Sequence, residues 1–181
     1  MTDDVITQLA AARTNPSIIM VVGVGGAGGN AVNHMWNLGI KGVDFMVCNT
    51  DQQALDKSPV ELKVRLGSEG LGAGNDPENG RKAAIESLDV VRQRFEASGT
   101  KMVFITAGMG GGTGTGASPV IAKLAKEMGM LTVGIVTSPL AVEGKIRYEQ
   151  AFRGIEELRQ NVDSLLIINN ENILEIYGRL A

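Results

Sequence analysis

Two glycine-rich segments, each between an apolar run and a helix-like segment, are the residues of this sequence best suited to chemistry. They are Gly23–Asn30, which reads GVGGAGGN, and Gly108–Gly116, which reads GMGGGTGTG. Glycine loses more backbone entropy on folding than any other residue, so such density indicates backbone that approaches a ligand closely or adopts positive φ. A helix that follows such a loop adds unpaired N–H groups and the positive end of its dipole, which favour anions. The two loops therefore predict a polyphosphate held from two sides, and hence a nucleotide-binding protein.

The elements that must position these loops follow an alternation of strand and helix signals. Short runs rich in Val, Ile and Phe, typical of strands buried on both faces, occupy Ile18–Val24, Val43–Cys48, Met102–Ala107, Leu131–Thr137 and Ser164–Ile168. The alternating run Val60–Leu66 is predicted as an edge strand, and helical spacing of apolar residues predicts helices over Asn30–Leu38, Glu78–Ala97, Ala117–Met128 and Glu143–Val162. Repeated strand–helix–strand units predict an α/β, Rossmann-like doubly wound fold, with a mostly parallel sheet and helices on both faces. Ligands of such sheets bind at the carboxyl ends of the strands, where both glycine loops fall.

Composition fits this class and removes several others. The 181 residues, 44% of them hydrophobic, suffice for one domain with a sizeable core. With 17 basic and 20 acidic residues the net charge is −3, which does not favour a nucleic-acid partner. Cys48 is the only cysteine, which excludes an intramolecular disulfide. His34 is the only histidine, which excludes a His-based metal site or a catalytic triad.

The sequence contains no targeting signal that the usual patterns detect. No apolar run approaches the roughly 18 residues of a membrane span, so no direct membrane insertion is expected. The N-terminus begins Met-Thr-Asp-Asp and lacks the basic region of a signal peptide. We therefore expect a cytoplasmic protein in which residues 1–16 are a flexible polar lead-in and residues 17–181 form one domain.

The first loop alone is compatible with a different cofactor. Gly23-x-Gly25-x-x-Gly28 matches the dinucleotide fingerprint, and Asp44 stands roughly where a ribose-binding acid is expected, which favours an NAD(P)-binding Rossmann module. A Walker loop is excluded because neither glycine run is followed by Lys and Ser or Thr. The second loop argues against a dehydrogenase, since a nicotinamide cofactor has one pyrophosphate, and this loop adds a second nest with two hydroxyls.

The second loop also carries a specific family resemblance. Gly110–Gly116 resembles the signature of the tubulin superfamily, and its surroundings are similar to the bacterial cell-division GTPases of the FtsZ type. The similarity runs almost without gaps from Ile18 onward and includes Gly23–Asn30, Asn49-Thr50-Asp51, Gly70–Gly74, Gly108–Gly116, Glu143-Gly144-Lys145-x-Arg147 and Val162-Asp163-Ser164-Leu165. Six motifs in the same order argue against chance. The resemblance implies the GTP-binding domain of a GTP-hydrolysing, filament-forming cytoskeletal protein that builds the cell-division ring.

The resemblance further implies roles for individual residues. Backbone amides would hold the α- and β-phosphates of GTP or GDP from one side at Gly26, Ala27, Gly28, Gly29 and Asn30, and from the other at Gly112, Thr113 and Gly114. The remaining matches are Gly72, Ala73 and Gly74 in the loop that senses the γ-phosphate, Glu143 and Arg147 beside ribose and phosphate, and Asn170 at the guanine edge. No lysine lies within the phosphate loops, so backbone dipoles and Mg²⁺ must supply most of the charge compensation. No metal site made of protein ligands alone is expected.

Several of these residues have an equally simple structural interpretation. Gly23 and Gly25 fit close strand–helix packing as well as they fit direct contact with a ligand. Glu143 is also accounted for as a helix N-terminal acid, and Arg147 as its exposed ion-pair partner four residues on. Asn170 is as well suited to capping the last helix as to contacting a base.

The sequence departs from the family in two places. The aromatic residues usual before Glu143-Gly144 are missing from Pro139–Val142, so packing against ribose or base is expected to differ in detail. The sequence also ends at Ala181, whereas family members continue into a long central helix, a loop with acidic residues and a second domain. We therefore expect a GTP-binding domain truncated before the central helix, with the catalytic loop beyond Ala181 and no catalytic residue within the sequence.

The resemblance also implies partners and a place of action. The full-length protein would assemble with itself head to tail at the division site, and would recruit cell-division proteins through regions outside this sequence. Because the catalytic loop is expected elsewhere, these residues alone are expected to lack sustained GTP turnover. A nucleotide-regulated assembly module without catalysis is a further interpretation.

Overall fold

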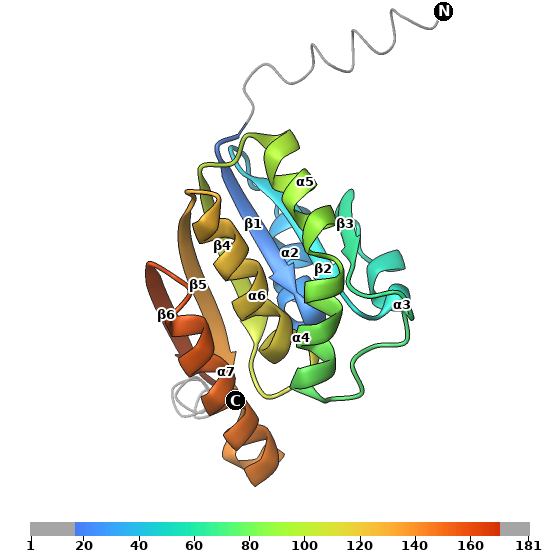
Figure 1. Cartoon of the computed structure of the whole chain (residues 1–181), viewed down its shortest axis with the longest axis vertical. Coiled ribbons are helices and arrows are strands. Elements are labelled where there is room, and N and C mark those ends of the chain that lie inside the picture. Colours follow the sequence, from blue (N-terminus) through green and yellow to red (C-terminus); the bar gives the residue numbers. More distant parts are fainter. Residues whose placement is uncertain (1–16, 171–181) are drawn as a thin grey trace, which may run out of the picture.

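The structure is a computed structural model that describes residues 17–170, and it is built on a single parallel sheet (Figure 1). Six strands lie in the order β3-β2-β1-β4-β5-β6. They are β1 Ile19–Val24, β2 Asp44–Asn49, β3 Leu62–Arg65, β4 Met102–Gly108, β5 Leu131–Ser138 and β6 Ser164–Asn169. The chain winds outward from β1 to β3, then returns to β4 on the other side of β1 and winds outward again. The predicted doubly wound α/β fold is confirmed, and its switch point lies between β1 and β4.

Helices cover both faces of the sheet. They are α2 Gly25–Asn37, α3 Gln52–Asp56, α4 Pro77–Glu86, α5 Leu88–Ser98, α6 Thr113–Glu127 and α7 Lys145–Arg159, with a short 3₁₀ turn at Ala141–Glu143. Helices α4, α5, α6 and α7 lie on one face, and their apolar residues share one core cluster with β1, β4 and β5. Helices α2 and α3 cover β1 and β2 on the other face. The switch point is therefore enclosed by α2 on one side and α6 on the other.

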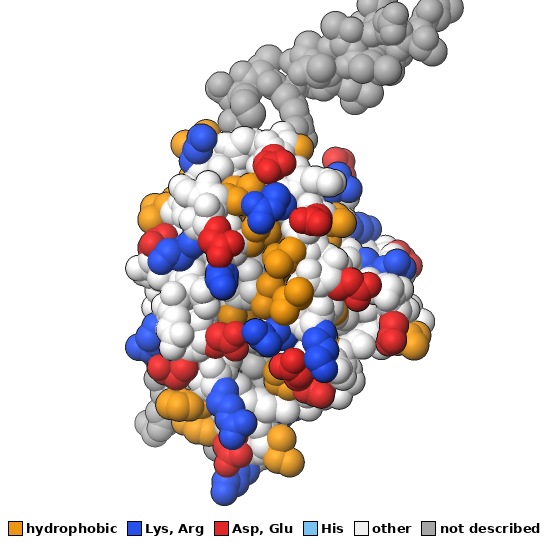
Figure 2. Space-filling view, viewed as in Figure 1, with side chains coloured by type: hydrophobic (Ala, Val, Ile, Leu, Met, Phe, Trp, Pro, Cys, Tyr) orange, Lys and Arg blue, Asp and Glu red, His pale blue; other side chains and the backbone are white. Residues whose placement is uncertain are grey.

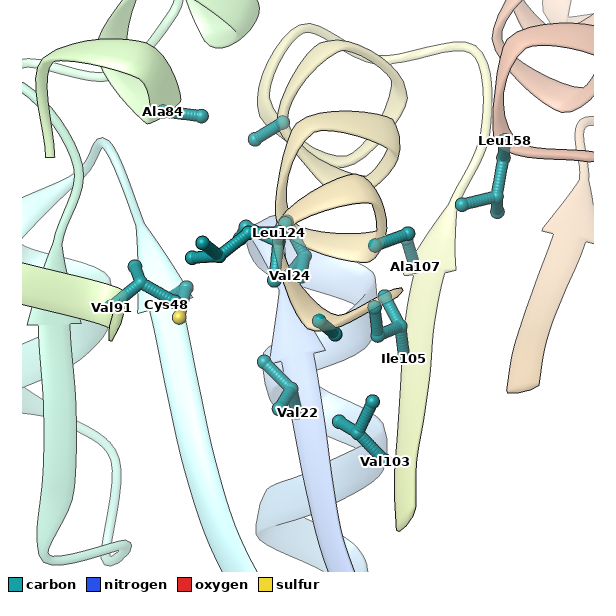
Figure 3. Close-up of a cluster of buried hydrophobic side chains, with 14 of the residues drawn as sticks. Val22, Val24, Cys48, Ala84, Val91, Val103, Ile105, Ala107, Leu124 and Leu158 are labelled. Atoms are coloured by element: carbon teal, nitrogen blue, oxygen red, sulfur yellow. The ribbon is translucent and has the colours of Figure 1, made fainter. Parts of the chain in front are cut away.

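Burial on both faces explains the continuous apolar runs of the inner strands. In β1, Val22 and Val24 point into the larger core together with Ile105 of β4 and Leu124 of α6 (Figure 3). Val21, the residue before Val22, belongs to the smaller core under α2 and α3. Strands β1, β2 and β4 thus contribute apolar side chains to both layers, as expected for parallel sheets covered by helices.

Two helix predictions differ from the structure. The helix predicted over Glu78–Ala97 is two helices that divide at Ser87, whose φ of −103° and ψ of 10° interrupt the helix. The side chain of Ser87 accepts a hydrogen bond of 2.8 Å from the N–H of Gly67, so a contact with the loop after β3 fixes the break. The helix predicted from Asn30 begins at Gly25, because the glycines of the first loop themselves form its first turns.

The other segments agree with the sequence or add small elements. Strand β3 lies at the edge of the sheet, as predicted for Val60–Leu66, but only the central residues of that run form the strand.

Figure 2 shows Lys and Arg side chains interspersed with Asp and Glu over the face formed by α4, α5, α6 and α7. In the part of the chain that the structure describes, no helix is long and apolar enough to cross a membrane.

Candidate functional site

The glycine-rich loops meet at the carboxyl ends of β1, β4 and β5, where they line a cleft of about 370 Å³. The lining residues are Val24, Gly26, Ala27, Ala73, Asn75, Gly108, Met109, Gly111, Gly112, Thr113, Gly114, Thr137, Ser138, Pro139, Glu143, Arg147 and Asn170. Segments more than a hundred residues apart in sequence therefore share one wall. This is the position at which doubly wound sheets bind ligands.

Helix α2 places its first turn at the cleft. The residue before it, Val24, offers no side-chain cap, and no acidic residue lies in the first turn. The backbone N–H groups there are not satisfied by a capping side chain, and the positive end of the helix dipole is not neutralised. Gly26 and Ala27 of this turn line the cleft. The start of α2 is therefore suited to an anion.

The glycines of α2 divide into two kinds. A Cβ atom at Gly26 or Gly29 would meet nothing within 4 Å, so packing does not require glycine at either position. A Cβ atom at Gly28 would collide with the carbonyl oxygen of Thr106 in β4, and one at Gly23 would collide with the carbonyl oxygen of Gly28. Gly23 and Gly28 thus serve the close packing of α2 on the sheet, whereas Gly26 leaves open space on the cleft side.

Helix α6 presents a second N-terminal turn to the same cleft. Its N-cap is Gly112, no side chain caps it, and its first turn contains no acid. Helices α3 and α4, which begin nearby, are instead capped by the carboxylates of Asp51 and Asp76. Helices α2 and α6 therefore keep free of capping side chains the first-turn N–H groups that Asp51 and Asp76 engage in α3 and α4.

The two glycine loops touch directly. Gly25 has a φ of 72°, and a Cβ atom on it would lie 2.8 Å from the backbone nitrogen of Gly114. The hydroxyls of Thr50 and Thr113 form a buried hydrogen bond of 2.6 Å. The Thr113 hydroxyl thus has a protein partner and links the start of α6 to the segment after β2. Gly25 is required for the close approach of the loops, whatever else it contacts.

The loop before α4 forms a third wall. Gly72 donates its N–H to the carbonyl oxygen of Thr50 at 3.0 Å, which ties this loop to the end of β2. Ala73 lines the cleft, and a Cβ atom at Gly112 would lie 2.8 Å from the Cβ of Ala73 and 3.0 Å from the backbone nitrogen of Asp76. Glycine at 112 therefore lets this loop lie directly against the start of α6.

An ion pair closes the far end of the cleft. One carboxylate oxygen of Glu143 accepts a hydrogen bond of 2.9 Å from the N–H of Leu140, and the other accepts one of 2.8 Å from the Arg147 guanidinium. The Leu140 N–H first, and then Arg147, lower the pKa of Glu143 below its ordinary value of 4.5. The exposed ion pair expected at this spacing is present, and both its residues line the cleft.

Because the pKa of Glu143 is depressed in the folded state, its contribution to stability is present above the ordinary pKa and is lost as pH falls through the folded-state pKa. We expect Arg147→Gln to raise that pKa only part of the way to its ordinary value, because the Leu140 N–H remains. NMR titration of the Glu143 carboxyl group measures this. Arg153→Gln, on the same helix, should leave the titration unchanged. An unaltered Glu143 pKa in Arg147→Gln would show that Arg147 does not contribute to the lowered pKa.

The cleft brings together most of the residues predicted from the sequence, namely Gly26, Ala27, Ala73, Gly112, Thr113, Gly114, Glu143, Arg147 and Asn170. Gly29 and Asn30 line an adjoining hollow of about 270 Å³ that shares Gly26 with the cleft, and Gly72 lines another that shares Ala73. Gly28 is buried within α2, where the helix packs against β4, and Gly74 lies outside all three cavities.

Sequence reasoning missed several lining residues. Thr137, Ser138 and Pro139 lie at the carboxyl end of β5, and the rule that ligands bind at that edge could have singled them out. Met109 lies within the second glycine-rich loop, and no signal in the sequence marks it as a lining residue. Asn75 is the one non-glycine residue with positive φ, 61°, in the described part of the chain, and Asn is a residue that tolerates this conformation.

The fold and the cleft together define a class. A parallel α/β domain with two uncapped, glycine-rich helix N-termini at the carboxyl ends of its strands has the architecture typical of nucleotide-binding domains. The GTPase domain of the Tubulin/FtsZ family matches residues 18–178 of this sequence. The chain belongs to the Tubulin/FtsZ family. This membership does not favour the NAD(P)-binding alternative.

Individual relatives agree with the family. The chain is similar to the cell division protein FtsZ of Porphyromonas gingivalis, with 54% identity over 168 residues that cover 91% of this chain and 37% of the relative. It is similar to the structure of an empty FtsZ dimer of M. jannaschii, with 40% identity and a TM-score of 0.85 over 97% of this chain and 51% of that one. A GTPgS-bound CetZ2 protofilament from Haloferax volcanii has 28% identity and a TM-score of 0.78 over 84% of this chain and 49% of that one. The chain thus spans about half the length of these relatives, or less.

Proposed function

We propose that residues 17–181 form a guanine-nucleotide-binding domain whose cleft holds the phosphates of GTP or GDP between the N-termini of α2 and α6. The observation that carries the proposal is the convergence of two uncapped helix N-termini on one cleft. Two such termini offer opposed sets of N–H donors, which suits a chain of two or three phosphates better than a single anion. Family membership selects the guanine nucleotides.

The proposed contacts follow the two helices and the loop before α4. The α- and β-phosphates lie against backbone amides of Gly26, Ala27, Gly28, Gly29 and Asn30 on one side and of Gly112, Thr113 and Gly114 on the other. The γ-phosphate faces Gly72, Ala73 and Gly74. Ala73 is the member of that loop that lines the cleft, which supports this placement.

The opposite end of the cleft is assigned to the nucleoside. Glu143 and Arg147 stand beside ribose and phosphate, and Asn170 contacts the guanine edge. Asn170 follows β6 directly and lines the same cleft as the glycine loops, which supports a ligand contact over a cap alone. Glu143 is held in place by Leu140 and Arg147, so its free lone pairs keep a defined direction.

Charge compensation in this site comes mainly from the backbone and from Mg²⁺. Of the described residues that line the cleft, Arg147 is the only cation. No group of three or more His, Cys, Asp or Glu side chains within residues 17–170 is placed to hold a metal. A cleft lined by a single carboxylate, that of Glu143, among its described residues fits Mg²⁺, which is usually held by substrate phosphates, waters and one or two carboxylates. Bound there, Mg²⁺ would neutralise charge on the phosphate oxygens.

Side-by-side binding titrations with GTP, GDP, ATP and NAD test the proposal. GTP and GDP should bind at least about tenfold more tightly than ATP, since base-edge hydrogen bonds contribute about 1 kcal/mol each. NAD should bind negligibly, because it carries adenine in place of guanine and because a second nucleoside stands where GDP and GTP have their terminal phosphate. Tighter binding of NAD than of GDP would overturn the assignment to guanine nucleotides.

We further propose that the whole protein hydrolyses GTP, assembles head to tail with copies of itself and acts in the cytoplasm at the division site, with division proteins as partners. The name of the P. gingivalis relative and the protofilament formed by CetZ2 support this. Among the described residues that line the cleft, Glu143 is the only carboxylate, and both its oxygens are already hydrogen-bonded. A group that activates water must then come from elsewhere.

Phosphate release should therefore stay at background when residues 1–181 are mixed with GTP and Mg²⁺ at rising protein concentration. Addition of a full-length family member should permit release, because its subunits bring the missing groups to the interface. Binding of GDP by the same preparation is the control for a competent site. Turnover that rises with the concentration of these residues alone would place the catalytic groups within them.

A further inference from the structure

Thr115 contacts two different parts of the cleft wall with its two γ-atoms. It lies in the first turn of α6 and is 2% exposed. Its hydroxyl oxygen accepts a buried hydrogen bond of 2.8 Å from the N–H of Gly110. Gly110 has a φ of 104° and stands between Met109 and Gly111, which both line the cleft. This hydrogen bond therefore fixes the loop that precedes α6 at its middle.

The methyl group of Thr115 faces α7. A Cβ atom at Gly154, a buried residue in the middle of α7, would collide with Cγ2 of Thr115 and would lie 3.3 Å from the Thr115 carbonyl oxygen. Helix α7 can thus lie this close to α6 only because residue 154 has no side chain. The first turn of α7 carries Arg147 to the cleft.

Gly110 completes a closed set of contacts. A Cβ atom on Gly110 would lie 3.0 Å from the carbonyl oxygen of Arg147 and 3.3 Å from Cγ of Pro139. The loop before α6 thus rests against the start of α7, while Thr115 holds the loop with its hydroxyl and seats α7 with its methyl. One side chain is connected to both walls of the cleft.

We propose that Thr115 is a positioning residue for nucleotide binding. Its hydroxyl fixes the position of the loop before α6, and its methyl group fixes the distance between α6 and α7, and hence the position of Arg147 at the cleft. The inference rests on the proposed function, because it concerns the same cleft. It differs from a purely structural role in what it requires: loss of the hydroxyl's hydrogen bond, or displacement of α7 away from Thr115, must change affinity for the nucleotide, and not stability alone.

The first test separates the hydroxyl from the methyl. Thr115→Val should raise the Kd for GDP about tenfold, the equivalent of one lost hydrogen bond. Thr115→Ser retains the hydroxyl and should keep Gly110 in place and the affinity close to that of the unchanged protein. The matched control is Thr132→Val. Thr132 is fully buried, donates to the Met130 carbonyl oxygen at 3.1 Å and lies at the amino end of β5, away from the cleft, so this change should lower stability without changing Kd.

The second test uses a compensating pair. Gly154→Ala should weaken GDP binding, because its Cβ pushes α7 away from Thr115 and moves Arg147. Adding Thr115→Ser removes Cγ2, the atom with which that Cβ collides, and should restore both the affinity and the unfolding temperature. Restoration by a second substitution of what the first one loses is expected only for residues in direct contact. If the double variant bound GDP no more tightly than Gly154→Ala, the proposal that the Thr115 methyl group positions α7 would be overturned.

Amide hydrogen exchange of Gly110, measured by NMR without nucleotide, keeps this test separate from the proposed function. The Gly110 N–H should be protected in the unchanged protein and in Thr115→Ser, and should exchange faster in Thr115→Val. If the unchanged protein bound no guanine nucleotide, the proposed function would fail while this measurement still reported on the hydrogen bond. Native GDP affinity in folded Thr115→Val, or equal Gly110 exchange in all three proteins, would overturn the proposal.

Discussion

Gly26→Asp should remove most of the affinity for guanine nucleotides while the protein stays folded. A side chain at Gly26 meets nothing within 4 Å in the protein and enters the open space of the cleft at the start of α2. A carboxylate in the first turn of a helix is favourable by about 0.3–1 kcal/mol, so stability should hold or rise slightly. The same carboxylate about 4 Å from a phosphate charge costs roughly 4 kcal/mol at an effective dielectric constant of 20, so the Kd should rise at least about a hundredfold.

Gly26→Asn is the matched control because it has the same size without the charge. It should weaken binding less than Gly26→Asp, and the difference between the two variants should shrink as salt is added, since salt screens the repulsion. Calorimetric titration with GDP gives the affinities, and thermal unfolding gives the stabilities. Native affinity in Gly26→Asp would show that phosphate does not lie at the start of α2.

Gly28→Ala and Gly29→Ala should change stability in opposite directions although the residues are adjacent. A Cβ at Gly28 collides with the carbonyl oxygen of Thr106, so α2 must move away from β4, which should cost about 3 kcal/mol or more. A Cβ at Gly29 meets nothing within 4 Å, and replacing a helical glycine by alanine should stabilise by about 0.5–1 kcal/mol.

Urea unfolding followed by circular dichroism measures both changes, and each variant serves as the control for the other. The pair also tests which glycines of the first loop serve packing. Equal and small effects would show that α2 can shift on the sheet without cost, and that Gly28 is kept for a reason other than its contact with Thr106.

The class of fold could be predicted because its signals are local. Short apolar runs alternating with helical patterns require parallel strands with crossovers, and crossovers place the loop after each strand at one edge of the sheet. Both glycine loops follow predicted strands, so their meeting at that edge followed from the connection rules. The family signature in Gly110–Gly116 is likewise contiguous in the sequence.

The predictions that differed from the structure depend on contacts between distant segments. The break at Ser87 needs the N–H of Gly67, which is twenty residues away, and the helical pattern on either side runs through it without a signal. The start of α2 at Gly25 was missed because glycine has low helix propensity, and here the packing of Gly28 on β4 overrides that preference.

From the sequence alone, the protein is determined to be a parallel α/β domain of the Tubulin/FtsZ type with two glycine-rich loops at one edge of its sheet, since periodicity and motif spacing carry that information. Only the tertiary structure decided what each glycine does, because every glycine looks alike in sequence and differs solely in what surrounds its missing side chain. Gly26 faces the cleft, Gly28 faces β4, and Gly112 faces the loop before α4. Gly26 is the one of these three at which a side chain would find open space, and this becomes known only once the distant walls of the cleft are in place.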